Sequence, residues 1–416
     1  MSRLVGDRVN GFAGWRVRGL NLRTCELANS RTREPIRVMY VIWSLGLGGA
    51  EQVVIRLATG LDRRRFTPII CCLNDVGAFA HQAQRRGIEV IALSKQRRYD
   101  LLMLWKLARL MRQRRVAIVH THLWGANCWG RLAAWMAGVP VIIAHEHGMQ
   151  PWRGRLHFFI DRLLMRLTDR VLFASEQVRQ DYVARVCSHA DRCQVIPNGV
   201  ASVTEMANRH AMRQRLGWSE QDRIILSVGR LAPEKGYRDL LDAFATVLRC
   251  VPEARLVIIG DGAQRQELAV LHNRCGLNGH VKFLGRLDEV GPWFAVADLY
   301  VQPSHREGLP LAMLEAMAAG LPVVVTRVGD AAHVVETGGG GIVVPPQDPA
   351  RLAQALAQLL QDPQRRSRLA IAAQATVQQL YSIEQMLDRV QGVYKEELMR
   401  DKGHGARGVG EERNFQ

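Results

Sequence analysis

The sequence alternates short apolar runs with helix-forming segments over most of its length, and this alternation limits the chain to a few folds. Six apolar runs in the first half have the length and composition of buried strands: residues 38–43, 68–73, 89–93, 117–120, 141–144 and 171–174. Helical patterns lie between them, for example at residues 101–112 and 130–137. Such an alternation predicts a parallel sheet with helices on both faces.

The alternation is interrupted once and then resumes. Residues 195–199, Val-Ile-Pro-Asn-Gly, break the pattern, and a polar segment follows to about residue 223. The second series of strand patterns occupies residues 224–228, 255–259, 281–284, 299–301, 323–326 and 341–344. We therefore expect an α/β protein with two doubly wound Rossmann-like domains, residues 36–198 and 199–380, whose ligands lie at the carboxyl ends of the strands.

The two ends of the chain differ from this pattern. Residues 1–35 lack periodicity and are expected to form a disordered arm, and residues 401–416 a disordered tail. Residues 381–400, between the second domain and the tail, are expected to form a C-terminal helix.

A chain of 416 residues, 48% of them hydrophobic, can fill two sizeable cores. No apolar run approaches the ~18 residues of a membrane-spanning helix. The first 34 residues lack the continuous apolar segment of a secretory signal. The eight cysteines show neither zinc-ligand spacing nor the density of a disulfide scaffold. These features predict a cytoplasmic protein with reduced thiols.

The net charge of +17 is distributed unevenly along the chain. Residues 36–198 hold 24 basic and 11 acidic side chains, whereas residues 199–416 hold 25 of each. The basic half therefore predicts a negatively charged partner, and we favour an anionic membrane surface or a phosphorylated acceptor. Nucleic acid is the competing partner, but no nucleic-acid motif or basic run interleaved with aromatic residues is present.

Residues 303–320 carry two glutamates, Glu307 and Glu315, with seven residues between them. Glu307 should lie in a loop past a strand's carboxyl end, and Glu315 about two turns inside a helix that Pro310 opens and Gly320 closes. Carboxylates accept hydrogen bonds from hydroxyls, and a helix N-terminus binds anions, so the pair predicts a phosphate-bearing polyol as ligand. The alternative is a solvated loop glutamate and an unrelated helix-surface glutamate.

A glycine-rich turn, residues 44–51, follows the first predicted strand and opens a helix. Gly48 and Gly49 allow close approach of a ligand, and the helix start offers amides to a phosphate. As a dinucleotide fingerprint the turn is poor, because Glu51 occupies the place of the third glycine. A simple tight turn from strand to helix is the alternative.

Four histidines end two neighbouring strands of the first domain. They are His120, His122, His145 and His147. A four-histidine metal site is conceivable, but no carboxylate or cysteine shows ligand spacing, so we expect no metal. We favour the interpretation that these histidines orient a sugar hydroxyl or contact a phosphate. The alternative is that some of them are core histidines with satisfied hydrogen bonds.

Arg230 and Lys235 follow the first strand of the second domain, across a turn made by Pro233 and Gly236. Two cations at this spacing predict a clamp for a diphosphate, with Arg binding two oxygens and Lys acting as a point charge. A solvated turn is the alternative.

The sequence resembles the retaining nucleotide-sugar glycosyltransferases of family 4, which have the GT-B fold. The resemblance extends from about Arg37 to Tyr394. It rests on motifs in this order: Gly-Gly-Ala-Glu (48–51), His-Thr-His-Leu (120–123), Ile-Pro-Asn-Gly-Val (196–200), Gly-Arg-Leu-Ala-Pro-Glu-Lys-Gly (229–236), Gly-Asp-Gly (260–262) and the spaced glutamates.

The resemblance implies roles for particular residues. Glu307 would bind hydroxyls of the transferred sugar, Glu315 the nucleotide ribose, and Arg230 and Lys235 the departing diphosphate, while His122 would lie near the reacting centre. No metal and no cofactor beyond the nucleotide sugar are implied. The other implied donor-binding residues are Gly48, Gly49, Gly308, Leu309 and Leu311, and the implied acceptor-side residues are His120, His145 and His147.

The resemblance also implies that the C-terminal helix returns to the first domain, which would bind the acceptor. One departure from the family pattern stands after residues 326–329. The family commonly has a Pro-Glu pair there, whereas this chain has Asp-Ala-Ala-His, with His333 in place of the glutamate. A sugar-donor preference cannot therefore be carried over from relatives.

An amphipathic segment, residues 101–115, combines an apolar stripe with basic residues. Its stripe consists of Leu101, Leu104, Trp105, Ala108 and Met111, and packing on the sheet is the favoured explanation. The basic residues, together with residues 97–98 and the loop 151–155, keep attraction to an anionic membrane open.

The expected protein is a cytoplasmic glycosyltransferase, with association at the inner face of the cell membrane left open. Its acceptor would be a lipid-linked molecule or a glycan in cell-surface polysaccharide or lipopolysaccharide biosynthesis. Two alternatives remain: a GT-B-fold sugar-nucleotide epimerase or hydrolase, and a non-enzymatic binder of anionic membranes or nucleic acid.

Overall fold

The computed structural model describes residues 34–46, 48–94, 100–148, 152–186, 189–201 and 209–406. The chain divides into two units, Met1–Pro35 and Ile36–Gln416, and the second holds the structure set out below. Almost all of the predicted arm and the last ten residues of the predicted tail lie outside the described residues, as do the basic residues 97–98.

The first domain is built on a seven-stranded parallel sheet in the order β3-β2-β1-β4-β5-β6-β7. Its strands are β1 Ile36–Ile42, β2 Phe66–Cys72, β3 Glu89–Ala92, β4 Ile118–His122, β5 Val141–Glu146, β6 Arg170–Phe173 and β7 Cys193–Val195. The apolar runs predict six of these strands. They do not predict β7, whose three residues are too few for a periodic pattern.

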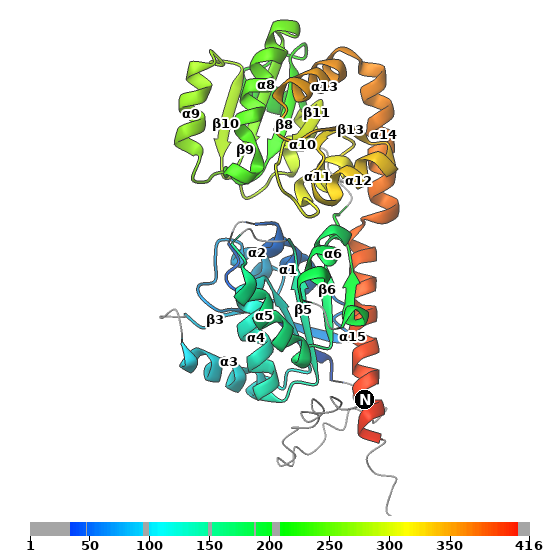
Figure 1. The fold of residues 1–416 in the computed structure, drawn as a ribbon. Helices are drawn as coiled ribbons and strands as arrows, with labels where there is room; N and C mark the ends of the chain where they lie inside the picture. The colour runs from blue at the N-terminus through cyan, green and yellow to red at the C-terminus, as the bar shows by residue number, and fades with distance from the viewer. Residues whose placement is uncertain are drawn as a thin grey trace, which may run out of the picture. The chain divides into compact units, whose positions relative to one another are not determined.

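Helices cover both faces of this sheet (Figure 1). They are α1 Gly49–Gly60, α2 Ala80–Arg85, α3 Leu101–Gln113, α4 Trp124–Ala137, α5 Arg155–Leu164 and α6 Glu176–Val186, with short 3₁₀ segments at Met165–Leu167 and Ala190–Arg192. The carboxylate of Asp100 begins α3 by accepting a bond from the amide of Met103 at 3.1 Å. Gly138, with φ of +72°, ends α4.

The second domain contains a six-stranded parallel sheet in the order β10-β9-β8-β11-β12-β13. Its strands are β8 Arg223–Val228, β9 Ala254–Ile259, β10 Val281–Gly285, β11 Leu299–Gln302, β12 Val323–Thr326 and β13 Gly341–Val344. The helices are α7 Arg209–Leu216, α8 Tyr237–Cys250, α9 Arg265–Arg274, α10 Gly291–Val296, α11 Leu311–Ala318, α12 Gly329–Gly338 and α13 Pro349–Gln361, with a 3₁₀ turn at Pro233–Lys235. The predicted fold class, two doubly wound Rossmann-like domains, is confirmed.

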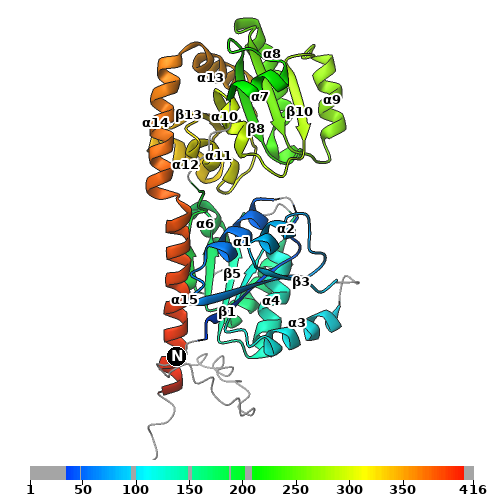
Figure 2. The ribbon, with the colours of Figure 1, turned by 180° about the vertical axis from the view of Figure 1, so that it is seen from behind.

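Two long helices end the described chain, α14 Pro363–Leu380 and α15 Ile383–Ala406 (Figure 2). Helix α15 contacts the first domain, where Nε of Arg170 donates to Glu397 at 2.8 Å and the ring of Tyr394 meets Phe66 edge-on at 5.8 Å. The helix continues to Ala406, six residues beyond its predicted end, so the predicted disordered tail is wrong for residues 401–406.

The apolar stripe of α3 does not behave as one surface. Met103, Leu104, Leu107, Ala108 and Met111 are buried, but Leu101 is 75% exposed and Trp105 51% exposed. Packing on the sheet therefore explains only part of the predicted stripe.

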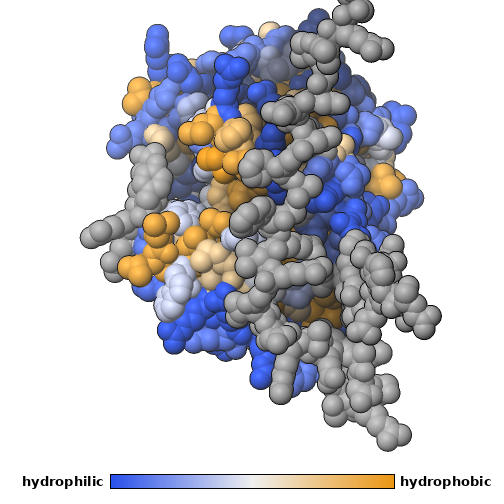
Figure 3. Space-filling view, turned by 60° about the horizontal axis from the view of Figure 1, so that its bottom comes forward, coloured by the Kyte–Doolittle hydropathy of each residue, from blue (hydrophilic) through white to orange (hydrophobic). Residues whose placement is uncertain are grey.

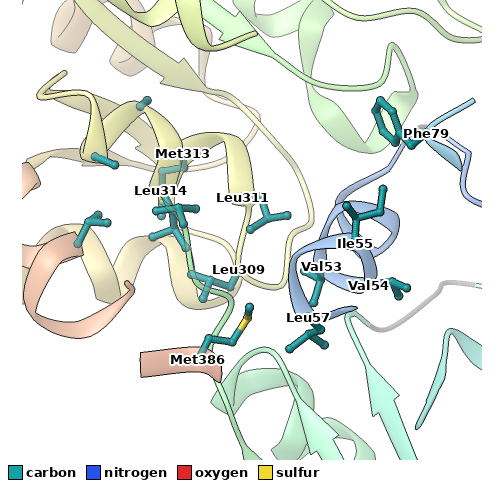
Figure 4. Close-up of a cluster of buried hydrophobic side chains, with 14 of the residues drawn as sticks. Val53, Val54, Ile55, Leu57, Phe79, Leu309, Leu311, Met313, Leu314 and Met386 are labelled. Carbon is teal, nitrogen blue, oxygen red and sulfur yellow. The ribbon is translucent and has the colours of Figure 1, made fainter. Parts of the chain in front are cut away.

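One hydrophobic cluster contains residues of both domains, so the two domains pack against each other through apolar side chains. It includes Leu57 from α1, Leu309 from the loop before α11, Leu311 from the start of α11, and Met386 from α15. In Figure 4, Leu311 extends from α11 toward α1. A Cβ placed on Gly49 would lie 3.5 Å from Cδ1 of Leu311, an ordinary van der Waals distance, so this packing does not require glycine. Among the described helices, none is long and apolar enough to cross a membrane.

Candidate active site

An open cleft of about 1970 Å³ lies between the two domains, at the carboxyl ends of their strands. Its first-domain wall includes Gly48, Gly49 and His147, and its second-domain wall includes residues of the turns after β8 and β11. The fold thus brings together segments that are more than two hundred positions apart in the sequence.

Glu307 lies in the loop between β11 and α11, as predicted, and lines the cleft. Its Oε1 accepts three hydrogen bonds, from Nζ of Lys235 at 2.6 Å, Oγ of Ser304 at 2.7 Å and Nε2 of Gln302 at 2.9 Å. Because all three bonds converge on Oε1, Oε2 is the oxygen available to a hydroxyl of a ligand.

The contact between Lys235 and Glu307 depends on a glycine. Gly236 follows Lys235 with φ of +67°, and a Cβ there would lie 2.0 Å from the carbonyl oxygen of Pro303. Only glycine allows both this left-handed conformation and this close approach. The backbone of the turn after β8 therefore packs directly against the loop that carries Glu307.

The predicted cation pair reaches the cleft, but each member already has an acidic partner. Lys235 is bound to Glu307, and Nη2 of Arg230 lies 2.6 Å from Oε1 of Glu234. The Arg230 side chain is 65% exposed, so its ion pair is weak and easily exchanged for another anion.

Glu315 also lines the cleft and forms an ion pair with Arg56 of α1. Its helix begins at Leu311, which places Glu315 just over one turn inside, not two turns as predicted. Arg56 also donates to the carbonyl of Gly199 at 2.9 Å. Sequence reasoning missed Arg56, although its spacing of seven from Gly49 places both on one face of α1.

The glycine-rich turn lies against the same cleft. A Cβ on Gly48 would lie 2.3 Å from Oε2 of Glu51, which folds back over the turn. Burial raises the pKa of the Glu51 carboxyl, and nearby Arg230 partly opposes this shift. The predicted residues Gly308, Leu309 and Leu311 line the second-domain wall.

The four histidines form one cluster because β4 and β5 are adjacent and in register, with His122 opposite His145. His147 lines the cleft, whereas the other three are fully or almost fully buried. His122 is predicted to lie near the reacting centre, but its side chain is buried and its Nδ1 lies 2.9 Å from Nε2 of His147. The cleft is therefore reached by His147, with His122 behind it.

Burial holds all four imidazoles neutral. It lowers the pKa of His120 to about 3 and of His147 to about 4, and it lowers the pKa values of His122 and His145 well below the usual range. Neighbouring histidines add to the shifts of His120, His122 and His145. Among the described residues, five ring nitrogens of the cluster have no hydrogen-bond partner.

His120, His122 and His145 bring ring nitrogens within 4.8 Å of one another, which makes a metal ion worth testing against the geometry. The rings of His120 and His145 are stacked with an interplanar angle of 5°. Because nitrogen lone pairs lie in the ring plane, stacked rings direct them side by side and not toward one point. The arrangement fits aromatic packing better than a metal centre.

His333, at the position where the family commonly has glutamate, lies exposed on α12 outside the cleft. Its Nδ1 lies 3.4 Å from Oγ1 of Thr337 within the same helix. Asp330, three residues earlier, contacts the first domain, where it accepts a hydrogen bond from the amide of Glu176.

Comparison with known proteins places these features in a family. Residues 47–202 match the model described as Glycosyltransferase Family 4, and residues 208–376 match the model described as Glycosyl transferases group 1. The chain is 30% identical over 285 residues to a D-inositol 3-phosphate glycosyltransferase of Xylanimonas cellulosilytica, covering 62% of this chain and 67% of the relative.

Two further similarities extend over more of the chain. It is 24% identical over 353 residues to the UDP-Gal:alpha-D-GlcNAc-diphosphoundecaprenol alpha-1,3-galactosyltransferase of Escherichia coli, covering 80% of this chain and 89% of that enzyme. The crystal structure of Anabaena HepE in complex with UDP-glucose has the same fold, with a TM-score of 0.79 and 24% identity, covering 87% of this chain and all of HepE. The chain belongs to the family 4 glycosyltransferases.

Proposed function

We propose that the protein transfers a sugar from a nucleoside diphosphate donor to a lipid-linked or other glycan acceptor, with retention at the anomeric carbon. The observation that carries the proposal is the contact of Lys235 with Glu307 at 2.6 Å inside the cleft. It joins a cation suited to the diphosphate and a carboxylate suited to the sugar hydroxyls in one place.

In the proposed reaction the acceptor oxygen bonds to the anomeric carbon as the bond from that carbon to the phosphate oxygen breaks. The acceptor's proton passes to the departing phosphate, and attack on the face that the phosphate vacates gives retention. Lys235 and Arg230 would stabilise the charge that develops on the diphosphate, which supports chemistry without a metal ion. Oε2 of Glu307 would bind a hydroxyl of the sugar.

Glu315 and Arg56 are proposed to act on the nucleotide. A ribose hydroxyl would donate to the Glu315 carboxylate, which already holds Arg56 from the facing domain. The donor would then bridge the two domains, and Arg56 would orient the carboxylate that receives it.

A lipid-linked acceptor is supported by what relatives act on. The Escherichia coli relative is named for a diphosphoundecaprenol acceptor. A Mycobacterium tuberculosis relative, 31% identical over 258 residues, is a phosphatidylinositol monomannoside mannosyltransferase. The basic first domain suits a phosphorylated lipid of this kind, in cell-surface polysaccharide or lipopolysaccharide assembly.

The surface of the first domain supports association with an anionic membrane at its inner face. Figure 3 shows apolar side chains exposed among hydrophilic ones on the side of this domain that carries α3, α4 and α5. On α5, Leu156, Phe159 and Leu163 are 67%, 55% and 43% exposed and recur at helical spacing, with exposed Arg155 and Arg162 beside them. Such a face can insert in a bilayer while its cations bind phosphates.

A thermal-shift screen of the purified protein against UDP, GDP, ADP and their sugars tests donor binding. A ligand that binds only the folded state raises the melting temperature. We expect one nucleotide to give a clear shift that is lost in Lys235→Ala and kept in Arg238→Ala, because Arg238 pairs with Glu267 outside the cleft. No shift with any nucleotide would contradict the proposal, and donor turnover without an acceptor would indicate an epimerase or hydrolase.

A further inference from the structure

Asp330, at the start of α12 in the second domain, caps a helix of the first domain. Its Oδ2 accepts a hydrogen bond from the amide of Glu176 at 2.8 Å, and its Oδ1 accepts one from the amide of Gln177 at 3.2 Å. These are the first two residues of α6, which lie 154 and 153 positions away in the sequence. We name this pair of bonds the interdomain cap.

The interdomain cap completes a helix end that the first domain satisfies only in part. Oγ of Ser175 accepts from the amide of Val178 at 3.2 Å, which leaves the preceding two amides of α6 to Asp330. The first amides of a helix have no partner inside the helix and carry a partial positive charge. The Asp330 carboxylate of the other domain therefore accepts hydrogen bonds from these amides and offsets their partial positive charge. It can do so only while the two domains are in contact.

The same residue is bonded to the loop that carries Glu307. The amide of Asp330 donates to the carbonyl of Gly308 at 2.9 Å. Gly329 has φ of +54°, and a Cβ there would lie 2.4 Å from the carbonyl oxygen of Glu307. The backbone of residues 329–330 thus lies directly against the loop on its second-domain side.

The first domain contacts this loop from the opposite side. A Cβ on Gly308 would lie 2.8 Å from the carbonyl oxygen of His147, so the loop backbone touches the cleft-lining histidine segment. Nδ2 of Asn198 also donates to the carbonyl of Leu309 at 3.3 Å. The loop is enclosed between the two domains, and its placement depends on how closely they meet.

We propose that Asp330 is a positioning residue for sugar transfer: by capping α6 across the domain boundary, it holds the Glu307 loop against the first domain. Asp330 touches neither donor nor acceptor in this role. It acts through its backbone bond to Gly308, in the loop that carries Glu307. The ion pair of Arg56 with Glu315 is a further contact between the domains. The expected effect on the rate of sugar transfer rests on the proposed function, whereas the expected effect on how the domains meet does not.

The chain offers a matched control for this proposal. Asp348 caps α13 by accepting from the amide of Arg351 at 2.9 Å, and both residues belong to the second domain. Asp348→Ala therefore removes a helix-capping aspartate without removing a contact between domains. Asp330→Asn keeps one acceptor oxygen and loses the charge, so it serves as the conservative variant.

The experiment combines hydrogen exchange with donor kinetics for Asp330→Ala, Asp330→Asn and Asp348→Ala. In Asp330→Ala we expect faster exchange at the first turn of α6, a larger radius of gyration by small-angle X-ray scattering, and a loss of about tenfold in kcat/KM for the donor that includes a fall in kcat. Asp330→Asn should recover part of this loss, and Asp348→Ala should keep the wild-type kcat/KM.

Unchanged exchange at α6 in Asp330→Ala, or the same kcat/KM in Asp330→Ala as in Asp348→Ala, would overturn the proposal. If the wild-type protein transfers no sugar from any donor, the proposed function fails. Hydrogen exchange at α6 and the radius of gyration then test, without any activity measurement, whether the interdomain cap holds the two domains together.

Discussion

Nζ of Lys235 lies 2.6 Å from Oε1 of Glu307, so a cation and a carboxylate that both line the cleft neutralise each other. An incoming diphosphate would compete with Glu307 for Lys235. The exchange would leave Glu307 with its bonds from Ser304 and Gln302, which keep the carboxylate in place. The two residues are thus coupled, and substituting either one should affect both halves of the donor.

Lys235→Ala and Glu307→Gln should each abolish transfer while the protein stays folded. We expect kcat/KM to fall by roughly a hundredfold to a thousandfold, because Lys235→Ala removes charge that would stabilise the departing diphosphate and Glu307→Gln removes the carboxylate that would bind a sugar hydroxyl. Donor turnover measures the loss, and circular dichroism with thermal unfolding checks the fold. A rate near that of wild type in either variant would remove that residue from the site.

Arg56→Ala and Glu315→Gln should weaken donor binding to different extents. We expect the larger rise in donor dissociation constant, about tenfold, for Glu315→Gln, because it loses the proposed acceptor of a ribose hydroxyl. Arg56→Ala removes only the group that orients it. A double-mutant cycle by isothermal titration calorimetry measures their coupling. Additive effects would show that Arg56 does not act through Glu315.

Stability should fall on acidification because of the histidine cluster. The folded-state pKa values of the four histidines lie below the unfolded value of about 6.5. Their contribution is therefore complete above that pH and is lost as the pH falls toward about 4 for His147 and about 3 for His120. Each histidine that stays neutral in the folded state lowers the free energy of unfolding by about 1.4 kcal/mol for every unit by which the pH falls within this window.

Glu146 acts in the opposite direction. Burial raises its pKa, so its contribution is present below the unfolded value and is lost as the pH rises through the folded one. Glu51 and Asp169, whose pKa values burial also raises, act in the same direction as Glu146. The pKa values of the four histidines are lowered further, so the net effect remains a loss of stability on acidification. Urea unfolding between neutral and mildly acidic pH measures this slope, and His145→Gln should reduce it. An equal slope in that variant would contradict the assignment.

Transfer should continue in excess chelator. Arg230 and Lys235 both line the cleft. In the proposed reaction they would supply the positive charge that a divalent ion supplies to the leaving group in other enzymes. Donor turnover with and without EDTA is the measurement. Activity that is lost on chelation and restored by a divalent ion would disprove the metal-free mechanism.

The exposed face of α5 should determine binding to anionic vesicles. Leu156→Ser combined with Phe159→Ser should weaken binding to phosphatidylglycerol-containing vesicles by roughly tenfold, because the apolar insertion is lost. Val270→Ser with Ile371→Ser is the control, since these second-domain residues are 68% and 69% exposed. Equal binding by the two double variants in a vesicle sedimentation assay would rule out this face.

The sequence by itself determined the two sheets. The apolar runs predicted β12 and β13 to the residue. β12 is buried along its whole length, which is why it forms a continuous apolar segment between turns. The loop position of Glu307 followed from the same local pattern. Helix α4 was placed six residues too late, since none of its first residues carries a side-chain cap.

Only the tertiary structure decided which distant residues meet at the cleft. The ion pair of Arg56 with Glu315 joins positions 259 apart, and the interdomain cap joins Asp330 to amides on another domain. The structure also buried His122 behind His147, although strand periodicity treats the two alike. Local periodicity records which face of an element is apolar, but contacts between elements depend on how the sheets and helices pack in three dimensions.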